Sequence, residues 1–208
     1  MNLKELREKN IFKTKEDLKK SVKDDVLVIQ TVHLIDDLLL IINKLTTNLR
    51  ERFELEFGSA KNTLDFFSEL DKFNFKNNEE KERIFILKKV INNLVEFKDS
   101  EEKYLGILMG RCCNNLTNIC GSYIGAKLIL IAGGLENLAK MPSSKIQVLG
   151  AEKALFRHLT SGEKPPKFGV IFAHETISTS LKKGKAARQL ASKISIGVKK
   201  DYYGKIPL

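Results

Sequence analysis

Apolar side chains recur every three or four positions through two long stretches of the chain, residues 14–57 and 79–121. This spacing is typical of one face of an α-helix. The first stretch predicts one long helix or two helices end to end, with Thr14 and Asp17 resembling a capping pair and Gly58 as a C-terminal stop. Its apolar set is Val22, Val26, Ile29, Val32, Leu34, Ile35, Leu38, Ile42, Leu45, Leu49 and Phe53.

A shorter segment separates these two stretches. Ser59 opens a short predicted helix that contains Leu64, Phe66, Phe67 and Leu70, and a polar connector, KFNFKNN, follows it. Two long helices around a short segment predict an antiparallel hairpin of the coiled-coil type. Periodicity does not distinguish an ordinary bundle core from a spacer or dimerisation arm, so a homodimer through the arm stays open.

Glycine and proline divide the rest of the chain into shorter helical patterns. We expect helices at residues 122–131, 135–140, 144–159, 176–181 and 183–200. KFGVIFAH, residues 167–174, has strand-like character after a double proline, and we expect it to be extended. The predicted fold class is therefore all-α, with a helical hairpin arm at 1–120 and a compact helical domain at 121–208.

The positive charge is confined to the second of these parts. The chain carries a formal charge of +10, and residues 121–208 alone hold 15 Lys+Arg against 5 Asp+Glu. The first 120 residues hold 21 of each and are neutral as a whole. A concentration of this kind indicates a polyanionic partner. A basic surface without a particular partner is the alternative, and a membrane surface fits less well because the basic segments lack an exposed Trp/Phe/Leu face.

Composition excludes several other classes of function. The charged N-terminus shows no export signal, and no apolar run is long enough to span a bilayer. The three cysteines, Cys112, Cys113 and Cys120, indicate reduced thiols in a cytoplasmic protein and no zinc site. No histidine stands in a nucleophile–base arrangement and GSYIGAK lacks the phosphate-loop spacing, so we expect neither an enzyme nor a cofactor. The Lys-, Ile- and Asn-rich composition suits an AT-rich, archaeal genome.

One corner combines glycine, proline, serine and lysine. Gly133 and Gly134 interrupt a helical pattern, and Pro142 ends the next one. Ser143 or Ser144 is then placed to cap the following helix, whose free N–H groups favour an anion. Because Lys140 and Lys145 flank this helix start, a phosphate there would meet two cations.

GSYIGAKLILIAGGLENLAKMPSSKIQVLGAEKALFRHL, then PPKFGVIFAH, then KGKAARQLASKISIGVKKDYYG, resembles the Nop domain in order and spacing. That family includes the archaeal box C/D ribonucleoprotein core protein, its nucleolar relatives and a splicing factor of the spliceosomal tri-snRNP. Its members bind a kink-turn RNA together with a small, ribosomal-protein-like kink-turn-binding protein. The resemblance implies RNA contacts at Lys140, Ser144, Lys145, Lys167, Arg188, Lys193 and Lys199. It implies partner-protein contacts at Gly133, Gly134, Lys140, Ser143, Ser144 and Gln147.

The family's archaeal core protein starts with an α/β domain that recruits fibrillarin. This chain starts close to where that domain would end, so we expect a short form that lacks the fibrillarin-recruiting domain. For this chain alone we therefore do not expect fibrillarin as a partner. A salt-insensitive protein-interaction module, or a competitor of a longer relative without RNA binding, is the alternative function. A generic RNA binder would instead stack bases on exposed aromatics, and we expect Phe168, Phe172, Tyr202 and Tyr203 to be mostly packed in the core.

Overall fold

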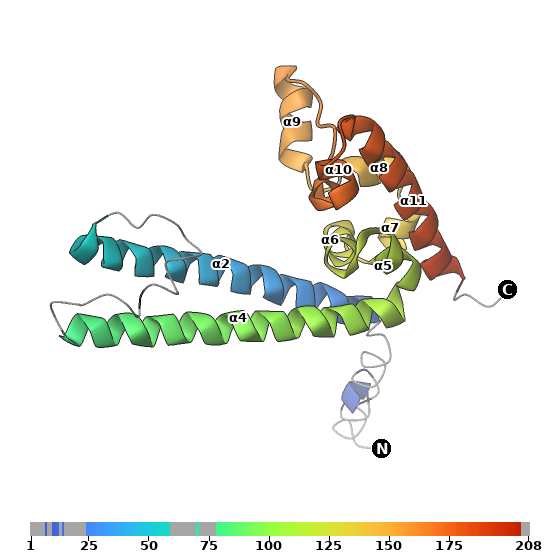
Figure 1. Cartoon of the computed structure of the whole chain (residues 1–208). Coiled ribbons are helices and arrows are strands. Elements are labelled where there is room, and N and C mark those ends of the chain that lie inside the picture. Colours follow the sequence, from blue (N-terminus) through green and yellow to red (C-terminus); the bar gives the residue numbers. More distant parts are fainter. Residues whose placement is uncertain are drawn as a thin grey trace. The chain divides into compact units, whose positions relative to one another are not determined.

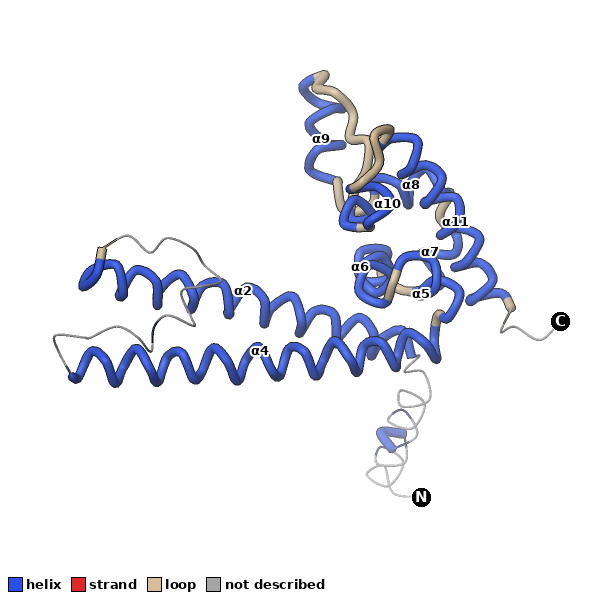
Figure 2. Tube along the Cα trace, in the orientation of Figure 1, coloured by secondary structure: helices blue, strands red, loops and turns tan. Residues whose placement is uncertain are grey.

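The computed structural model describes residues 7, 10–12, 14, 24–58, 70 and 78–204. Across these residues every element is helical, and none is a strand (Figures 1 and 2). The predicted all-α class is confirmed. In the same residues, none of the helices combines the length and the apolar character needed to cross a bilayer.

The chain forms two compact units. One comprises residues 33–104, and the other comprises residues 1–32 with 105–208. We call the first the arm and the second the C-terminal module. The predicted boundary at 120/121 lies inside the second unit, and the division into an arm and a separate domain at that position stays a prediction.

The arm consists of segments of two long helices, α2 (Asp24–Phe57) and α4 (Asn78–Cys112). Leu49 and Phe53, near the end of α2, share an apolar cluster with Leu70 and with Ile84 and Ile91, near the start of α4. Such pairing of the end of one helix with the start of the next requires an antiparallel hairpin, as the sequence predicts. Residues 15–23, and the short helix predicted from Ser59, lie outside the described residues except for Leu70.

The second long pattern does not form one helix. It was expected to run to Gly121, but α4 ends at Cys112 and a new helix, α5 (Asn114–Cys120), begins after Cys113. The break is stabilised by Asp201, whose Oδ2 accepts a hydrogen bond from the Leu116 backbone N–H at 2.8 Å. The other carboxylate oxygen accepts from the backbone N–H of Asn115 at 3.0 Å. A carboxylate from the far end of the module therefore caps the new helix.

The rest of the C-terminal module is a set of short helices around one long one, α11 (Lys183–Tyr203). The buried face of α11 packs against α5, α7 and α8, and its end is fixed to α5 by Asp201. Leu128, Ile129, Leu138, Ile146 and Ile194 are fully buried. The short elements are α6 (Ser122–Ala132), α7 (Leu135–Lys140), α8 (Ser143–Val148), α9 (Glu152–Ser161), η2 (Val170–Ala173) and α10 (Glu175–Ser178).

Two expectations for this module are wrong. Residues 144–159 do not form one helix, because Gly150 adopts φ +87°, a conformation that only glycine takes easily. The Glu152 carboxylate then accepts the Gly150 backbone N–H at 2.8 Å and helps to start α9. The segment 167–174 is not extended throughout, because residues 170–173 form one turn of 3₁₀-helix.

Candidate nucleic-acid interface

The glycine pair at 133–134 builds the turn between α6 and α7. Gly133 has φ +75°, and its N–H donates to the Leu130 carbonyl at 3.0 Å. Gly134 has φ +126°, and its N–H donates to the Ile129 carbonyl at 2.9 Å. These two bonds form a Schellman motif, in which left-handed backbone closes a helix. The backbone conformation of this turn therefore accounts for the presence of both glycines. Their contact with a partner protein stays a prediction.

The start of α7 is occupied by a carboxylate of the chain itself. Asp25 on α2 accepts the Leu135 backbone N–H with its Oδ2 at 3.0 Å. A Cβ at Gly134 would lie 3.3 Å from the same oxygen, so glycine leaves room for this contact. The N-terminus of α7 is thus capped from another helix and does not offer an anion site.

In the corner from Lys140 to Gln147, the N-cap of α8 is not one of the two predicted serines. Neither Ser143 nor Ser144 is the N-cap; Pro142 is, and no side chain caps α8. The Pro142 carbonyl accepts the N–H groups of Lys145 and Ile146 at 3.0 and 3.2 Å. Because α8 has only six residues, its dipole is weak, and the lysines supply most of the positive potential at this corner.

Lys140 and Lys145 are both exposed, as a phosphate contact requires. Lys140 Nζ lies 2.7 Å from Glu136 Oε1, one helical turn earlier. The hydrogen bond and charge of Glu136 raise the pKa of Lys140, with smaller contributions from Tyr202 and Tyr203 at the end of α11. Lys140 is therefore charged at neutral pH and stands near the last turn of α11.

Gln147 and Lys167, which are distant in the sequence, are joined directly. The Gln147 side chain donates from Nε2 to the Lys167 carbonyl at 2.7 Å. The Gly169 N–H donates back to the Gln147 carbonyl at 2.9 Å. A Cβ at Gly169 would lie 1.9 Å from the Leu149 carbonyl oxygen, so only glycine permits this close approach. The structure thus brings the predicted Lys167 next to the Lys140–Gln147 corner.

The three predicted basic residues of α11 do not share one edge. At about 100° per residue, Arg188 and Lys199 lie roughly 20° apart around the helix, whereas Lys193 lies about 140° from Arg188. Asp201 and Gly197, which touch α5, lie on the Lys193 side of the buried face. Tyr202, close to Lys140, lies on the opposite side. Arg188 and Lys199 therefore lie towards the Tyr202 side of α11, and Lys193 lies on the α5 side.

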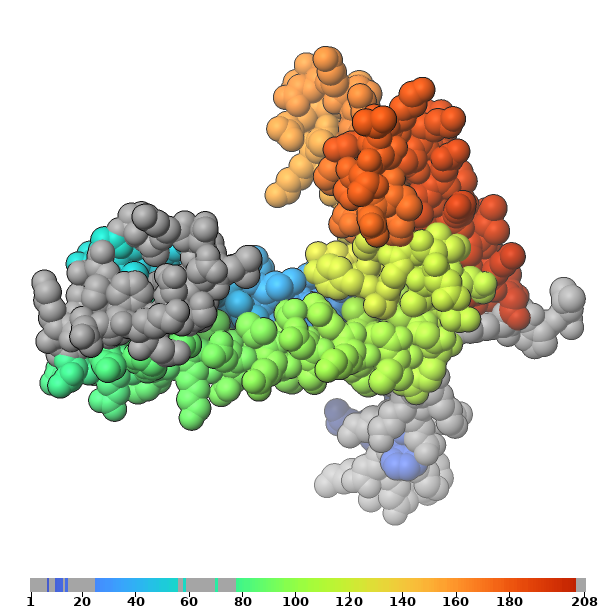
Figure 3. All heavy atoms as spheres, viewed as in Figure 1, coloured from blue at the N-terminus to red at the C-terminus, as the bar shows by residue number. Residues whose placement is uncertain are grey.

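Helix α9 carries an apolar face that the sequence reasoning missed. It has no buried residue, and Phe156 and Leu159 are 67% and 74% exposed. Figure 3 shows side chains of α9 projecting from the module. An apolar run at helical spacing predicts a core contact, so this pattern alone does not reveal that the face is uncovered.

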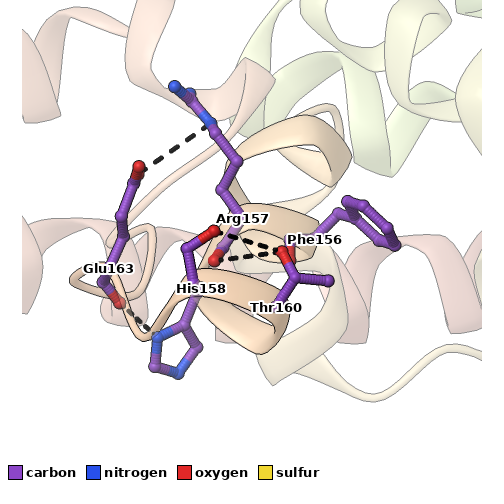
Figure 4. Close-up of polar contacts among 6 residues, drawn as sticks. Phe156, Arg157, His158, Thr160 and Glu163 are labelled. Atoms are coloured by element: carbon purple, nitrogen blue, oxygen red, sulfur yellow. Dashed lines mark hydrogen bonds and ion pairs between the residues drawn. The ribbon is translucent and has the colours of Figure 1, made fainter.

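Polar contacts on the other side of α9 hold the segment that follows it. Arg157 lies 3.9 Å from the Glu163 carboxylate, and His158 Nδ1 contacts the Glu163 carbonyl. Thr160 Oγ1 donates to the Phe156 carbonyl at 3.0 Å. Figure 4 shows that the Phe156 ring points away from the Arg157–Glu163 pair. The Phe156 ring and the Arg157 guanidinium thus point in different directions from α9.

The expectation for the aromatic residues is wrong for Phe172 and Tyr203. Phe172 is 39% exposed and Tyr203 is 49% exposed, while Phe168 and Tyr202 are half-buried. Phe172 stacks on Phe168 with 4.5 Å between ring centroids. The Lys183 ammonium lies 5.3 Å from the centre of the Phe172 ring. A ring at the rim of a small module covers its neighbour without being enclosed, and hydrophobicity in the sequence does not reveal this difference.

Potential metal ligands do not gather in the described part of the chain. No group of three His, Cys, Asp or Glu side chains there is placed to hold a metal ion. The three cysteines are buried, and burial raises the pKa of Cys120 to about 12. The Cys120 thiol is therefore neutral at physiological pH, which makes it a poor nucleophile and a poor ligand.

Comparisons with known proteins place these features in a family. The Nop family model, described as "snoRNA binding domain, fibrillarin", matches residues 5–207. An uncharacterized NOP5 family protein of Methanocaldococcus jannaschii is 51% identical over 116 residues, which are 55% of this chain and 28% of that protein. Nucleolar protein 58 of Botryotinia fuckeliana is 42% identical over 125 residues, 59% of this chain and 22% of that protein.

Other relatives agree with this assignment. Nucleolar protein 56 of Caenorhabditis elegans is 38% identical over 120 residues, 57% of this chain and 25% of that protein. A crystal structure of a fibrillarin/Nop5p complex superposes with a TM-score of 0.58 at 26% identity, covering 96% of this chain and 70% of that chain. That structure contains fibrillarin. It therefore does not support the expectation that this chain alone has no fibrillarin partner, which stays a prediction. The aligned segment spans about a quarter of the length of the curated relatives, and the family model covers nearly the whole chain: this protein belongs to the Nop family.

Proposed function

We propose that this protein is a ribonucleoprotein assembly component. In this proposal it binds a kink-turn RNA of the box C/D type together with the small kink-turn-binding protein. The observation that supports this function most directly is the positive charge of the C-terminal module. Thirteen of the fourteen Lys and Arg residues that the structure describes between 121 and 204 are exposed. Phosphate contacts from such side chains supply affinity with little sequence information.

The five carboxylates of the same region are outnumbered three to one by its basic side chains, and most of them make contacts within the chain. Of the five, Asp201 is buried against α5, Glu152 holds the Gly150 N–H, and Glu163 pairs with Arg157. Glu136 pairs with Lys140. Only this last pair lies at the proposed RNA-binding corner, and an exposed lysine exchanges such a partner for a phosphate at little cost.

The proposed RNA contacts group around the α7–α8 corner. Lys140 and Lys145 lie on it, and Lys167 is held next to it by Gln147. We assign the exposed Arg188 and Lys199, on the Tyr202 side of α11, to the same RNA. Recognition of a bent RNA then depends on shape and on the protein already bound. We assign the exposed apolar face of α9, formed by Leu155, Phe156 and Leu159, to the small protein partner, because apolar surface gives no affinity for phosphate.

A gel shift on kink-turn RNA, with and without the small partner protein, tests this function at two salt concentrations. We expect a supershift that requires the partner. The double variant Lys140→Ala/Lys145→Ala should lower the slope of log K against log[salt] by about 1 per lysine. Lys44→Ala/Lys103→Ala removes two exposed lysines from the arm and serves as the matched control.

Two other results would point elsewhere. Equal binding with and without the partner favours the generic RNA binder, which the exposed rings of Phe172 and Tyr203 would serve. A shift that requires the partner protein, needs no RNA and does not change with salt favours the protein-interaction module. Either result overturns the composite-surface function.

The arm supports a second, separable role as a homodimer contact. Ile86, Val90, Phe97 and Tyr104 are all exposed on α4. Their spacing of 4, 7 and 7 residues places them on one stripe, which lies away from the cluster formed with α2. Sedimentation of the wild type and of Val90→Glu/Phe97→Glu tests this role, and a monomeric wild type would exclude it.

A further inference from the structure

A surface pocket of about 490 Å³ lies between α5, α10 and α11, on the side of α11 that carries Lys193. The α7–α8 corner lies on the other side of that helix. The volume falls within the range of small-molecule sites in proteins, about 300–1,000 Å³. The pocket is lined by Asn118, Ile119, His174, Thr176, Ser180, Ala186, Gln189, Leu190 and Lys193.

The lining combines aliphatic and polar side chains. Ile119 and Leu190 supply aliphatic surface, and Leu190 is only 6% exposed. Asn118 and Gln189 each present an amide with both donor and acceptor atoms. Lys193 supplies the one lysine of the lining, and none of its residues is a carboxylate. The pocket therefore favours a ligand with a flat apolar body, mixed hydrogen-bonding edges and a negative group.

His174 is held in one orientation by its own loop. Its Nδ1 accepts the Thr176 backbone N–H at 3.2 Å and lies 2.8 Å from Thr176 Oγ1. In the neutral ring the proton then resides on Nε2, which makes that nitrogen a donor. A fixed imidazole offers both a flat face for stacking and a hydrogen-bond donor at its edge.

We propose that this pocket binds one unpaired nucleotide of the RNA. The inference rests on the proposed function and adds a second contact to it, on the other side of α11. The base lies on Ile119 and Leu190, its polar edge meets the amides of Asn118 and Gln189, and Lys193 meets the phosphate. Unpaired nucleotides are what proteins read in RNA, because the edges of paired bases are inaccessible in the deep groove. This role explains why Lys193 stands apart from Arg188 and Lys199.

The test compares two RNAs bound to the full chain and the small partner protein. One carries the kink turn closed by a loop of unpaired nucleotides, and the other carries the same kink turn closed by continuous duplex. Gln189→Ala should weaken binding to the looped RNA at least fivefold and change binding to the duplex-closed RNA less than twofold. Because no charge is removed, the salt dependence should stay the same.

The charge contact has a matched control on the same helix. Lys193→Ala should weaken binding to the looped RNA about tenfold. Lys200→Ala removes an equally exposed lysine two turns further along α11, outside the pocket lining, and should change binding less than twofold. Equal losses of affinity for the two variants would show that both lysines act through general electrostatic attraction. That result would overturn nucleotide binding in the pocket.

A direct titration separates failure of the pocket from failure of the proposed function. Uridine or cytidine 5′-monophosphate is added to the labelled protein while the amide signals of Gln189 and Lys193 are followed by NMR. We expect both to shift with a nucleotide and less with inorganic phosphate. Equal shifts with phosphate would reduce the site to an anion site and overturn base recognition.

The remaining outcomes are also decisive. RNA binding that depends on Lys140 and Lys145 but is unchanged in Gln189→Ala would leave the function standing and overturn the pocket. No RNA binding at all, with nucleotides still shifting Gln189, would overturn the RNA as source and identify a free nucleotide as ligand. No RNA binding and no shifts would overturn both.

Discussion

The buried carboxylate of Asp201 accepts the backbone N–H of Leu116 at 2.8 Å, across 85 positions of the chain. The same side chain accepts two further hydrogen bonds from Asn115, at 3.0 Å from the backbone and 2.8 Å from the side chain. One residue of α11 thereby decides where α5 starts. The register of α11 against α5 fixes which of its faces is exposed, and hence where Lys193 and Lys199 lie.

Removal of this cap should destabilise the C-terminal module. Asp201→Ala leaves the buried N–H of Leu116 and the partly buried N–H of Asn115 without an acceptor, and we expect the free energy of unfolding to fall by about 2 kcal/mol. Asp201→Asn retains one acceptor and should cost about half as much. Chemical denaturation measures both. Asp37→Ala removes an exposed carboxylate from the arm as the control, and an equal loss there would contradict the cap.

Two glycines should respond in opposite directions to the same substitution. Gly169→Ala places a methyl group 1.9 Å from the Leu149 carbonyl oxygen, and the segment must move away from α8. We expect a loss of about 2–3 kcal/mol. Gly184→Ala, in α11 with nothing within 4 Å of the new Cβ, should stabilise the protein by about 0.5–1 kcal/mol. Thermal unfolding of the two variants distinguishes this from a general intolerance of alanine.

The stability of the protein should fall at alkaline pH partly through Cys120. Burial raises the pKa of this thiol from 9.0 to about 12, so the folded state keeps a proton that the unfolded chain loses. The contribution is fully present below pH 9 and is lost as pH rises towards 12, by up to about 1.4 kcal/mol per pH unit. Cys120→Ala should therefore flatten the fall in the free energy of unfolding between pH 9 and pH 11. An identical slope in the variant would show that the thiol ionises freely in the native state.

The apolar face of α9 should matter for binding and not for folding. Phe156→Ala and Leu159→Ala truncate side chains that are 67% and 74% exposed, and each should change the free energy of unfolding by less than about 0.5 kcal/mol. Ile146→Ala, in the fully buried core, should cost about 2–5 kcal/mol. Affinity for the small partner protein, measured by calorimetry, should fall at least tenfold in the α9 variants. Unchanged affinity would remove α9 from the proposed interface.

The Glu136–Lys140 pair should oppose RNA binding. Glu136 holds the Lys140 ammonium at 2.7 Å and places a negative charge beside the proposed phosphate. Glu136→Gln releases the lysine, and we expect the assembled complex to bind about twofold more tightly at low salt, with a smaller gain at high salt. Glu175→Gln removes an exposed carboxylate elsewhere in the module and is the control. Weaker binding after Glu136→Gln would mean that the pair positions Lys140 for its contact.

Local rules were enough to predict several structural features of the α7–α8 corner. The Gly133–Gly134 interruption indicates a helix end because only glycine takes left-handed backbone without cost, and the structure has a turn of this kind there. The exposure of Lys140 and Lys145 follows from their charge. The break at Gly150 carried a similar signal and was missed, because its flanking residues continue the helical spacing without interruption.

The helical fold class, the apolar face of each long helix and the concentration of positive charge after residue 120 can all be read from the amino-acid sequence. These depend on spacing along the chain and on composition, which need no knowledge of distant contacts. The cap of α5 by Asp201, the bond from Gln147 to Lys167 and the packing of the Lys193 side of α11 beside α5 become visible only in the folded chain. Each of these depends on which elements pack together, because a buried polar group takes its partner from whatever segment lies beside it.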